Sequence, residues 1–173
     1  MKLPTEDSTV VTLKEFAFQT SASAKLTAKL RANQGALLQG GTGTGKTYIA
    51  AQSLCDILPE LMKDDTLGKG PIPILWIAPA ATIVQTQRVL KAYELAGKVM
   101  VMSYAALTSP KTGGAMFYES KTIVEWGQEH IVYGWSEFML PRMVVFDECQ
   151  ALKNDGSSRT NIARHLPTKN VKR

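Results

Sequence analysis

A glycine-rich segment, residues 40–47, constrains the fold of this chain more than any other feature. It reads Gly-Gly-Thr-Gly-Thr-Gly-Lys-Thr and satisfies the pattern G-x-x-x-x-G-K-[ST] at every fixed position. A short apolar run, residues 35–39, precedes it, and residues 47–58, apolar at helical spacing, follow it. Glycine permits the backbone angles that turn successive N–H groups toward one anion. The segment therefore predicts a buried strand, a phosphate-binding turn and a helix, whose dipole adds positive charge at the turn.

Three further apolar runs predict the rest of the sheet. Residues 74–78, 99–102 and 143–146 are uninterrupted by polar side chains, which is typical of strands covered on both faces. Helical or irregular segments separate them. We therefore predict an α/β fold, with a parallel β-sheet that carries helices on both faces and right-handed connections.

Helix boundaries are predicted from capping and helix-breaking residues. A helix over residues 21–33 has Ser21 or Ser23 as its candidate cap. Thr82, with Gln85 three residues later, matches a capping box that opens a second helix. That second helix is predicted to reach residue 96. Pro59 is predicted to end the helix at 47–58. Residues 121–138 are predicted to be helical in part.

Composition excludes several classes of protein. The chain has 173 residues, 45% of them hydrophobic and 20% charged, which is ordinary for one globular domain. Its two cysteines, Cys55 and Cys149, are too few and too far apart for a disulfide framework or a zinc ribbon. No apolar run reaches the ~18 residues of a membrane span, and the first residues lack the apolar stretch of a secretory signal. We expect a cytoplasmic or nuclear protein that is not secreted and has no membrane partner.

The positive charge is confined to one end of the sequence. Lysine and arginine outnumber aspartate and glutamate by 20 to 15, and the whole excess lies after residue 150. A short basic segment contacts phosphate groups or stays solvated at a frayed end. Composition alone favours the solvated state, and we assign residues 167–173 to a basic tail.

An acid pair, Asp147 and Glu148, follows the apolar run at 143–146. Because the carboxyl ends of parallel strands share one edge of a sheet, we expect this pair to lie beside the glycine-rich turn. Lys46 would then contact the β- and γ-phosphates of a nucleoside triphosphate, while Thr47 and Asp147 hold Mg²⁺. Glu148 would orient or deprotonate the attacking water. The predicted catalytic residues are Lys46, Asp147 and Glu148.

The neighbours of these residues resemble a known family. Asp147-Glu148-Cys149-Gln150, followed by Ala151-Leu152-Lys153-Asn154, is similar to the acid box of superfamily-two helicases and translocases, and closest to that of the Swi/Snf-type branch. Ser103-Tyr104 and Ile77-Ala78-Pro79 resemble two further motifs of that family, and Gln19 matches its upstream glutamine. The loop at 40–47 lacks the Met-Gly-Leu-Gly of the Swi/Snf branch, and Cys149-Gln150 replaces its usual Ala/Gly-His.

The resemblance implies a first RecA-like ATP-binding domain over residues 15–166, after a flexible N-terminus at 1–14. It implies ATP and Mg²⁺ as cofactors and nucleic acid as a partner, DNA favoured over RNA. It also implies a second RecA-like lobe, since residues 15–166 cover one lobe and stop before motif III; the isolated chain would then hydrolyse ATP weakly. The nucleotide would contact Gln19, Gly40, Gly41, Thr42, Gly43, Thr44, Gly45, Lys46 and Thr47, and the nucleic acid would contact Pro79, Ser103 and Tyr104.

Two alternatives remain open at the level of the sequence. The chain could be a nucleotide-binding interaction module that performs no hydrolysis. It could also be a different ATPase, such as an AAA+ ring loader. The segment Leu152-Lys153-Asn154 and the lack of a sensor strand or helical lid after it argue against the ring loader.

Overall fold

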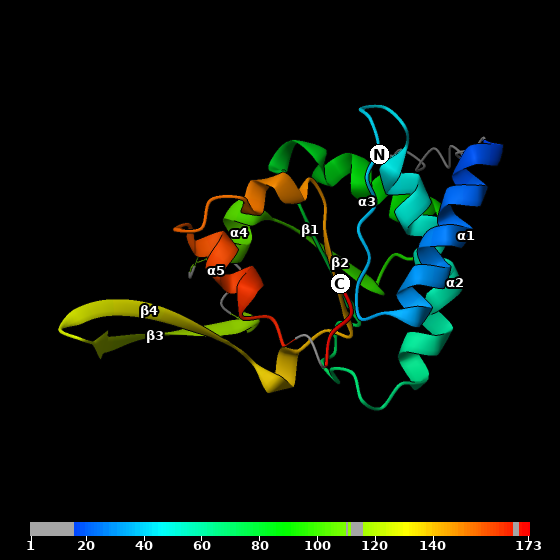
Figure 1. Ribbon diagram of the computed structural model, residues 1–173. Coiled ribbons are helices and arrows are strands. Elements are labelled where there is room, and N and C mark those ends of the chain that lie inside the picture. The colour runs from blue at the N-terminus through cyan, green and yellow to red at the C-terminus, as the bar shows by residue number, and fades with distance from the viewer. Residues whose placement is uncertain (1–15, 110, 112–115, 168–169) are drawn as a thin grey trace, which may run out of the picture.

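A computed structural model describes residues 16–109, 111, 116–167 and 170–173 of the protein (Figure 1). The predicted flexible N-terminus, residues 1–14, lies outside this part. Among the described residues, no helix combines the length and the apolar character needed to cross a membrane.

Three parallel strands form the centre of the fold, in the order β2-β1-β5. Their bounds are Ile74–Ala78 for β1, Val99–Ser103 for β2 and Met143–Phe146 for β5. In the middle strand, Trp76 lies opposite Val101 on one side and Val145 on the other. All five residues of β1 are buried, as expected for a strand with a neighbour on each edge and a layer on each face. The predicted parallel sheet is confirmed.

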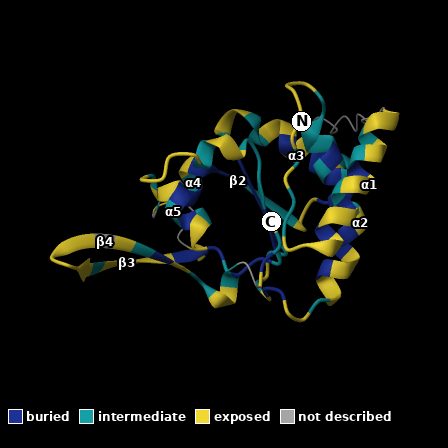
Figure 2. Ribbon diagram, in the orientation of Figure 1, coloured by how far each residue is buried: buried dark blue, intermediate teal, exposed yellow. Residues whose placement is uncertain are grey.

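Helices cover both faces of this sheet, which confirms the predicted α/β architecture (Figure 1). On one face, Trp76 packs among residues of α1, α2 and α3. On the other face, Leu75 and Ile77 pack against α4 and α5. Figure 2 shows the buried residues concentrated where the helices meet the sheet. The helices span Ala17–Ala32 (α1), Lys46–Lys63 (α2), Ile83–Ala92 (α3), Tyr104–Thr108 (α4) and Ser158–Arg164 (α5), and 3₁₀ turns span Ala80–Thr82 (η1), Glu137–Met139 (η3) and Cys149–Leu152 (η4).

Neither predicted helix cap makes a capping hydrogen bond, although Thr82 is the residue that precedes the first turn of α3, as predicted. Helix α1 begins at Ala17, before Ser21 and Ser23, and Phe16 precedes it without a side-chain cap. Ser23 is instead buried, and its hydroxyl lies 3.0 Å from that of Ser53, where it joins α1 to α2. Thr82 forms no capping box, because its hydroxyl donates to the Pro79 carbonyl at 3.0 Å.

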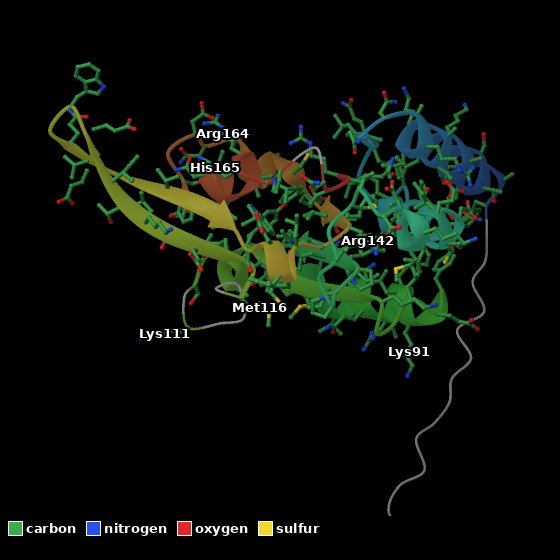
Figure 3. All side chains as sticks on the ribbon, turned by 90° about the horizontal axis from the view of Figure 1, so that it is seen from below. Lys91, Lys111, Met116, Arg142, Arg164 and His165 are labelled. Atoms are coloured by element: carbon green, nitrogen blue, oxygen red, sulfur yellow. The ribbon has the colours of Figure 1, made fainter. Side chains whose placement is uncertain are left out.

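Helix α2 continues through Pro59 to Lys63, which contradicts the predicted end. Proline removes one helical hydrogen bond, but Leu58 and Leu61 on either side of it are buried in the core. We attribute the continuation to this packing. Arg142, labelled in Figure 3, completes the helix end by donating to the Leu61 and Asp64 carbonyls at 2.7 Å each.

A β-hairpin replaces the helix predicted within residues 121–138. Strands β3 (Tyr118–Glu125) and β4 (Gln128–Trp135) pair antiparallel and extend away from the body (Figure 1). Trp126 and Gly127 form the turn with φ of 55° and 77°. Positive φ at both turn positions matches the right-handed twist of paired strands, which favours a hairpin. The β-branched residues of both strands add to this preference.

Residues 171–173 lie against the edge of the sheet at β5, so the expectation that the basic segment stays solvated does not hold for them. Val171 is completely buried, and Lys172 forms a parallel bridge with Met143 of β5. Residues 35–39, predicted as a buried strand, form no regular ladder with β5. The main chain of Arg173 lies between them and pairs with Gln34 and Ala36. The strand prediction is wrong here because a ladder needs a run of paired residues, and within the described residues only Ala36 of this segment, with Gln34 before it, pairs with the main chain of Arg173.

Candidate functional site

The glycine-rich loop joins residues 35–39 to the first turn of α2. Gly43 and Gly45 adopt left-handed backbone angles, with φ of 76° and 77°. Gly45 is also the N-terminal cap of α2, and a Cβ atom there would collide with the side-chain amide of Gln19. The left-handed backbone angle therefore favours glycine at position 45, whereas the Gln19 side chain could move aside for a Cβ atom. The Gln19 amide donates to the Thr44 carbonyl at 3.4 Å and supports the loop from α1.

Lys46 is the first residue of α2, and its ammonium group folds back onto the loop. Nζ donates to the carbonyl oxygens of Gly40 and Gly41 at 3.1 and 3.0 Å. The Thr44 hydroxyl donates to the same Gly41 carbonyl at 2.9 Å. An anion in the loop would offer the Lys46 ammonium a charged acceptor, which makes a stronger hydrogen bond than a neutral carbonyl.

The acid pair follows β5 at the carboxyl edge of the sheet. The Asp147 amide donates to the Ile77 carbonyl at 2.8 Å, which extends the pairing of β5 with β1 by one residue. Glu148 adopts left-handed angles, φ 52° and ψ 53°, before η4 begins. Its carboxylate accepts a hydrogen bond from the Gln150 side-chain amide.

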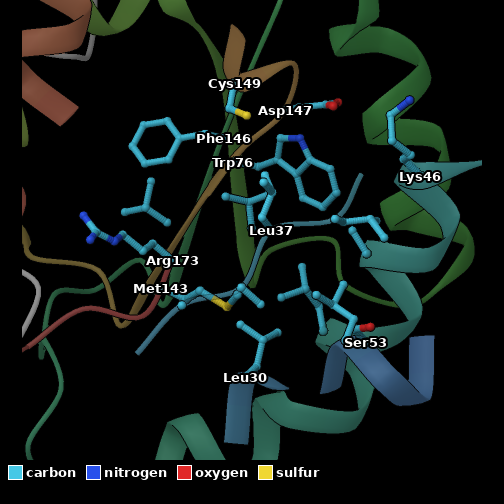
Figure 4. Close-up of a pocket in the computed structure, with 18 of the residues that line it drawn as sticks. Leu30, Leu37, Lys46, Ser53, Trp76, Met143, Phe146, Asp147, Cys149 and Arg173 are labelled. Carbon is cyan, nitrogen blue, oxygen red and sulfur yellow. The ribbon is translucent and has the colours of Figure 1, made fainter. Parts of the chain in front are cut away.

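The environment of Asp147 raises the pKa of its carboxyl group. Burial is the largest cause, and the negative charge of Glu148 is the second. The positive charge of Lys46 and the indole N–H of Trp76 act in the opposite direction. That indole N–H is buried and has no partner of full hydrogen-bond geometry among the described residues, although it faces the carboxylate closely enough to affect its pKa (Figure 4).

Replacing Asp147 with Asn is expected to stabilise the protein in the absence of nucleotide. Because the pKa is raised in the folded state, ionisation opposes folding at neutral pH, and this cost disappears as the pH falls below the unfolded-state value. We expect a higher Tm than that of the wild type at pH 7, and a difference that shrinks toward zero at pH ~3. Thermal unfolding at both pH values measures this difference in Tm, and Glu119→Gln serves as an exposed control. A variant that melts below the wild type at pH 7 would contradict the expectation.

One cavity of about 530 Å³ brings the loop and the acid pair together. Lys46 and Thr47 line it from α2, and Asp147 and Glu148 line it from the end of β5. Figure 4 shows Lys46 and Asp147 at this end of the cavity. Apolar side chains such as Leu30 form most of the rest, together with Gln34, Ser53, Gln150 and Arg173. Of the predicted nucleotide contacts, Gly40 to Gly45 and Gln19 lie in or beside the loop, outside the lining of this cavity.

The predicted nucleic-acid contacts lie at the same edge of the sheet. Pro79 follows β1, while Ser103 ends β2 and caps α4 by accepting from the Ala106 amide at 2.9 Å. Tyr104 is buried, and its hydroxyl donates to the Asp147 carbonyl at 2.8 Å. Burial raises the pKa of Tyr104, so the hydroxyl remains a donor. Sequence reasoning missed this link to the acid pair, and nothing in the local sequence around Tyr104 indicates it.

Removing the Tyr104 hydroxyl should loosen the turn that carries the acid pair. Tyr104→Phe leaves the Asp147 carbonyl without its donor, at an expected cost of ~1–2 kcal/mol in the free energy of unfolding. Tyr118→Phe is the control, since Tyr118 is similarly buried but its hydroxyl makes no hydrogen bond among the described residues. Denaturant unfolding compares the two variants. Equal effects would show that the bond to Asp147 contributes nothing of its own.

The donors present fit a magnesium-bound triphosphate. Thr47 and Asp147 offer oxygen atoms to one cavity, as Mg²⁺ requires, and Mg²⁺ usually keeps several waters and few protein ligands. Among the described residues there is no cluster of three or more His, Cys, Asp or Glu that could hold a metal alone.

Comparison of the chain with protein-family models, with curated proteins and with solved structures gives no match. The functional argument consequently depends on the residues and geometry described above.

Proposed function

We propose that the chain is the ATP-binding lobe of a nucleic-acid-dependent ATPase, a helicase or double-stranded DNA translocase of superfamily two with a RecA-like fold. One observation carries the proposal: Lys46 and Thr47, from the glycine-rich loop, line the same cavity as Asp147 and Glu148. A loop of this pattern at a helix N-terminus, opposite an acid pair at a strand end, is the arrangement that phosphoryl transfer uses.

Each residue has a distinct proposed role. The loop amides of residues 40–47 and the Lys46 ammonium bind the phosphates, while Thr47 and Asp147 hold Mg²⁺, which neutralises phosphate charge when bound. Glu148 accepts a proton from the attacking water or orients it. The family resemblance assigns Gln19 to the adenine base. In the structure its side-chain amide contacts the loop at the Thr44 carbonyl.

Nucleic acid, DNA in preference to RNA, is proposed as the partner because of the resemblance at Ser103-Tyr104 and Ala151-Leu152-Lys153-Asn154. Tyr104 gives a physical basis for coupling between the proposed nucleic-acid and nucleotide sites. It lies at the start of α4, and its hydroxyl donates a hydrogen bond to the Asp147 carbonyl. A second RecA-like lobe, in cis or in trans, would supply the arginine finger. The proposed compartment is the cytoplasm or nucleus.

Calorimetry with Mg-ATP tests the proposal directly. The isolated chain is expected to bind Mg-ATP with Mg²⁺-dependent affinity and to hydrolyse it slowly, since a missing arginine finger lowers the rate by ~10³–10⁵. Absence of binding would refute the nucleotide site. Binding with a rate that responds to neither DNA nor a separate second lobe would favour the interaction module over the motor, and fast DNA-stimulated turnover by the isolated chain would refute the need for that lobe.

A further inference from the structure

The outer part of the β3–β4 hairpin exposes apolar side chains on one face. Residues directly opposite each other in paired strands point to the same side, so Thr122 and Val124 share a face with Ile131. Val124 is 67% exposed and Ile131 58% exposed, and Trp126 in the turn is completely exposed. Figure 2 shows this exposure along the end of the hairpin that is remote from the body. Two strands alone are only marginally stable in water, so a further strand would stabilise this hairpin.

The outer edge of β3 has main-chain groups free for such a strand. The two-residue turn is closed by hydrogen bonds between Glu125 and Gln128, which flank it. Because hydrogen-bonded residues alternate along an antiparallel strand, the odd-numbered residues within 119–125 bond to β4. The N–H and C=O groups of the even-numbered residues within 120–124 point the other way. Within the described residues, no hydrogen-bond partner is found for these outward groups.

The charges of β3 complement those of a second β3 in one register. Two copies that pair antiparallel about a two-fold axis place one residue opposite itself at the axis and its neighbours opposite each other in reciprocal pairs. With Ile123 on the axis, Lys121 of each copy lies opposite Glu125 of the other. Both side chains are exposed and make no ion pair within the described residues. Opposite charges on neighbouring strands stabilise a sheet, and this pair occurs twice.

The neighbouring registers and the other strand lack this match. With Thr122 on the axis, Glu119 lies opposite Glu125, and with Lys121 on the axis, two lysines face each other. Like charges directly opposite destabilise a sheet. Strand β4 contains Glu129 but no lysine or arginine, so two copies of β4 offer each other no opposite charges.

We propose that β3 pairs antiparallel with β3 of a second copy of the chain, with Ile123 on the two-fold axis, so that two hairpins form one four-stranded sheet. Thr122 of each copy then lies opposite Val124 of the other, and both present outward main-chain groups. The pairing brings Val124 and Ile131 of both copies together on one face, where they cover one another. The turn of each hairpin ends beside residues 119–120 of the other copy, which are exposed.

A second copy of the chain fits this edge better than nucleic acid does. The hairpin carries Glu119, Glu125 and Glu129 against a single basic residue, Lys121, so it would repel phosphate groups. In a symmetric pair, by contrast, each favourable contact is made twice. The hairpin extends away from the body, whereas the nucleotide cavity lies between α2 and β5 (Figure 1). The inference therefore goes beyond the proposed nucleotide site and does not depend on nucleotide binding.

Charge reversal tests the register through the oligomeric state of the full chain. Sedimentation equilibrium without nucleotide, from about 1 µM to about 300 µM, should show a reversible dimer with a Kd between micromolar and millimolar. Lys121→Glu and Glu125→Lys each place two like-charge pairs in the interface and should raise the Kd at least ~10-fold. Glu119→Lys makes the same change of charge opposite Gly127 of the other copy, and this control should dimerise like the wild type.

A mixture of the two weakened variants should restore the dimer. In a mixed pair, one chain is acidic at both positions 121 and 125 and the other is basic at both, so every charge faces its opposite. We expect an equimolar mixture of Lys121→Glu and Glu125→Lys to dimerise at least as well as the wild type. The double variant that carries both substitutions should also dimerise with itself. Loss of folding in either single variant would not be reversed by mixing.

A cross-link checks the register independently of affinity. In a Cys55→Ser, Cys149→Ser background, Ile123→Cys should oxidise to a disulfide between two copies, because a residue on the axis faces itself at ~4.5 Å between Cα atoms. Glu119→Cys is the control, since its two copies would lie more than ~20 Å apart along the sheet.

Four results would overturn the proposal. They are a chain that stays monomeric throughout the concentration range, a dimer that Glu119→Lys weakens as much as the reversals at positions 121 and 125 do, mixed variants that do not associate, and equal cross-linking of Glu119→Cys and Ile123→Cys.

Discussion

Lys46→Ala is expected to weaken Mg-ATP binding by at least about 30-fold, because a charge-assisted hydrogen bond to phosphate contributes roughly 2 kcal/mol or more. The fold should survive. The carbonyls of Gly40 and Gly41, which accept from Lys46 in this structure, belong to exposed residues that water can reach. Calorimetric titration with Mg-ATP gives the affinity, and thermal unfolding checks the fold.

Lys63→Ala is the matched control for charge, since Lys63 is exposed in the last turn of the same helix. It should bind Mg-ATP like the wild type. If Lys46→Ala and Lys63→Ala bind equally well, the ammonium of Lys46 makes no contact with the nucleotide, and the proposed site must be abandoned.

Glu148→Gln is expected to retain Mg-ATP binding and to lose hydrolysis by ~10²–10⁴-fold, the range that general-base catalysis contributes. The substitution removes the proton acceptor with little change of shape. It also removes the negative charge that raises the pKa of Asp147, so Asp147 should be ionised at least as fully as before. Single-turnover measurements, with protein in excess of labelled ATP, make a slow rate accessible.

Glu137→Gln, at an exposed 3₁₀ turn after the hairpin, controls for the loss of one negative charge. It should leave both binding and hydrolysis unchanged. If Glu148→Gln instead weakens binding as much as Lys46→Ala, then Glu148 holds the nucleotide or its metal. The roles assigned to the two acids would then need to be exchanged.

The two substitutions separate two roles within the proposed site. Lys46 is expected to act on phosphate binding and Glu148 on hydrolysis, so the binding titration and the single-turnover rate test them independently.

The central architecture could be predicted because its signals are local. Residues 74–78, 99–102 and 143–146 are continuous apolar runs, a pattern typical of strands covered on both faces. The glycine pattern at 40–47 likewise reflects backbone angles that Gly43 and Gly45 adopt. The positions of Asp147 and Glu148 at the carboxyl edge follow from parallel strand direction alone.

Other elements could not be predicted because distant residues decide them. Ser23 contacts Ser53 across a helix interface instead of capping α1, and helix α2 passes Pro59 because its neighbours are buried. The Tyr104 bond to Asp147 joins residues far apart in the sequence. Propensity is a weak preference of the local chain, and tertiary packing overrides it.

The parallel sheet, the glycine turn and the position of the acid pair follow from local sequence, since each depends on steric and hydrophobic preferences of neighbouring residues. The absence of a ladder at residues 35–39 and the pairing of Lys172 with β5 follow only from the assembled fold. Both depend on which main-chain groups find a partner. Each backbone N–H and C=O can pair with any suitable strand, so the choice of partner is made by the assembled fold.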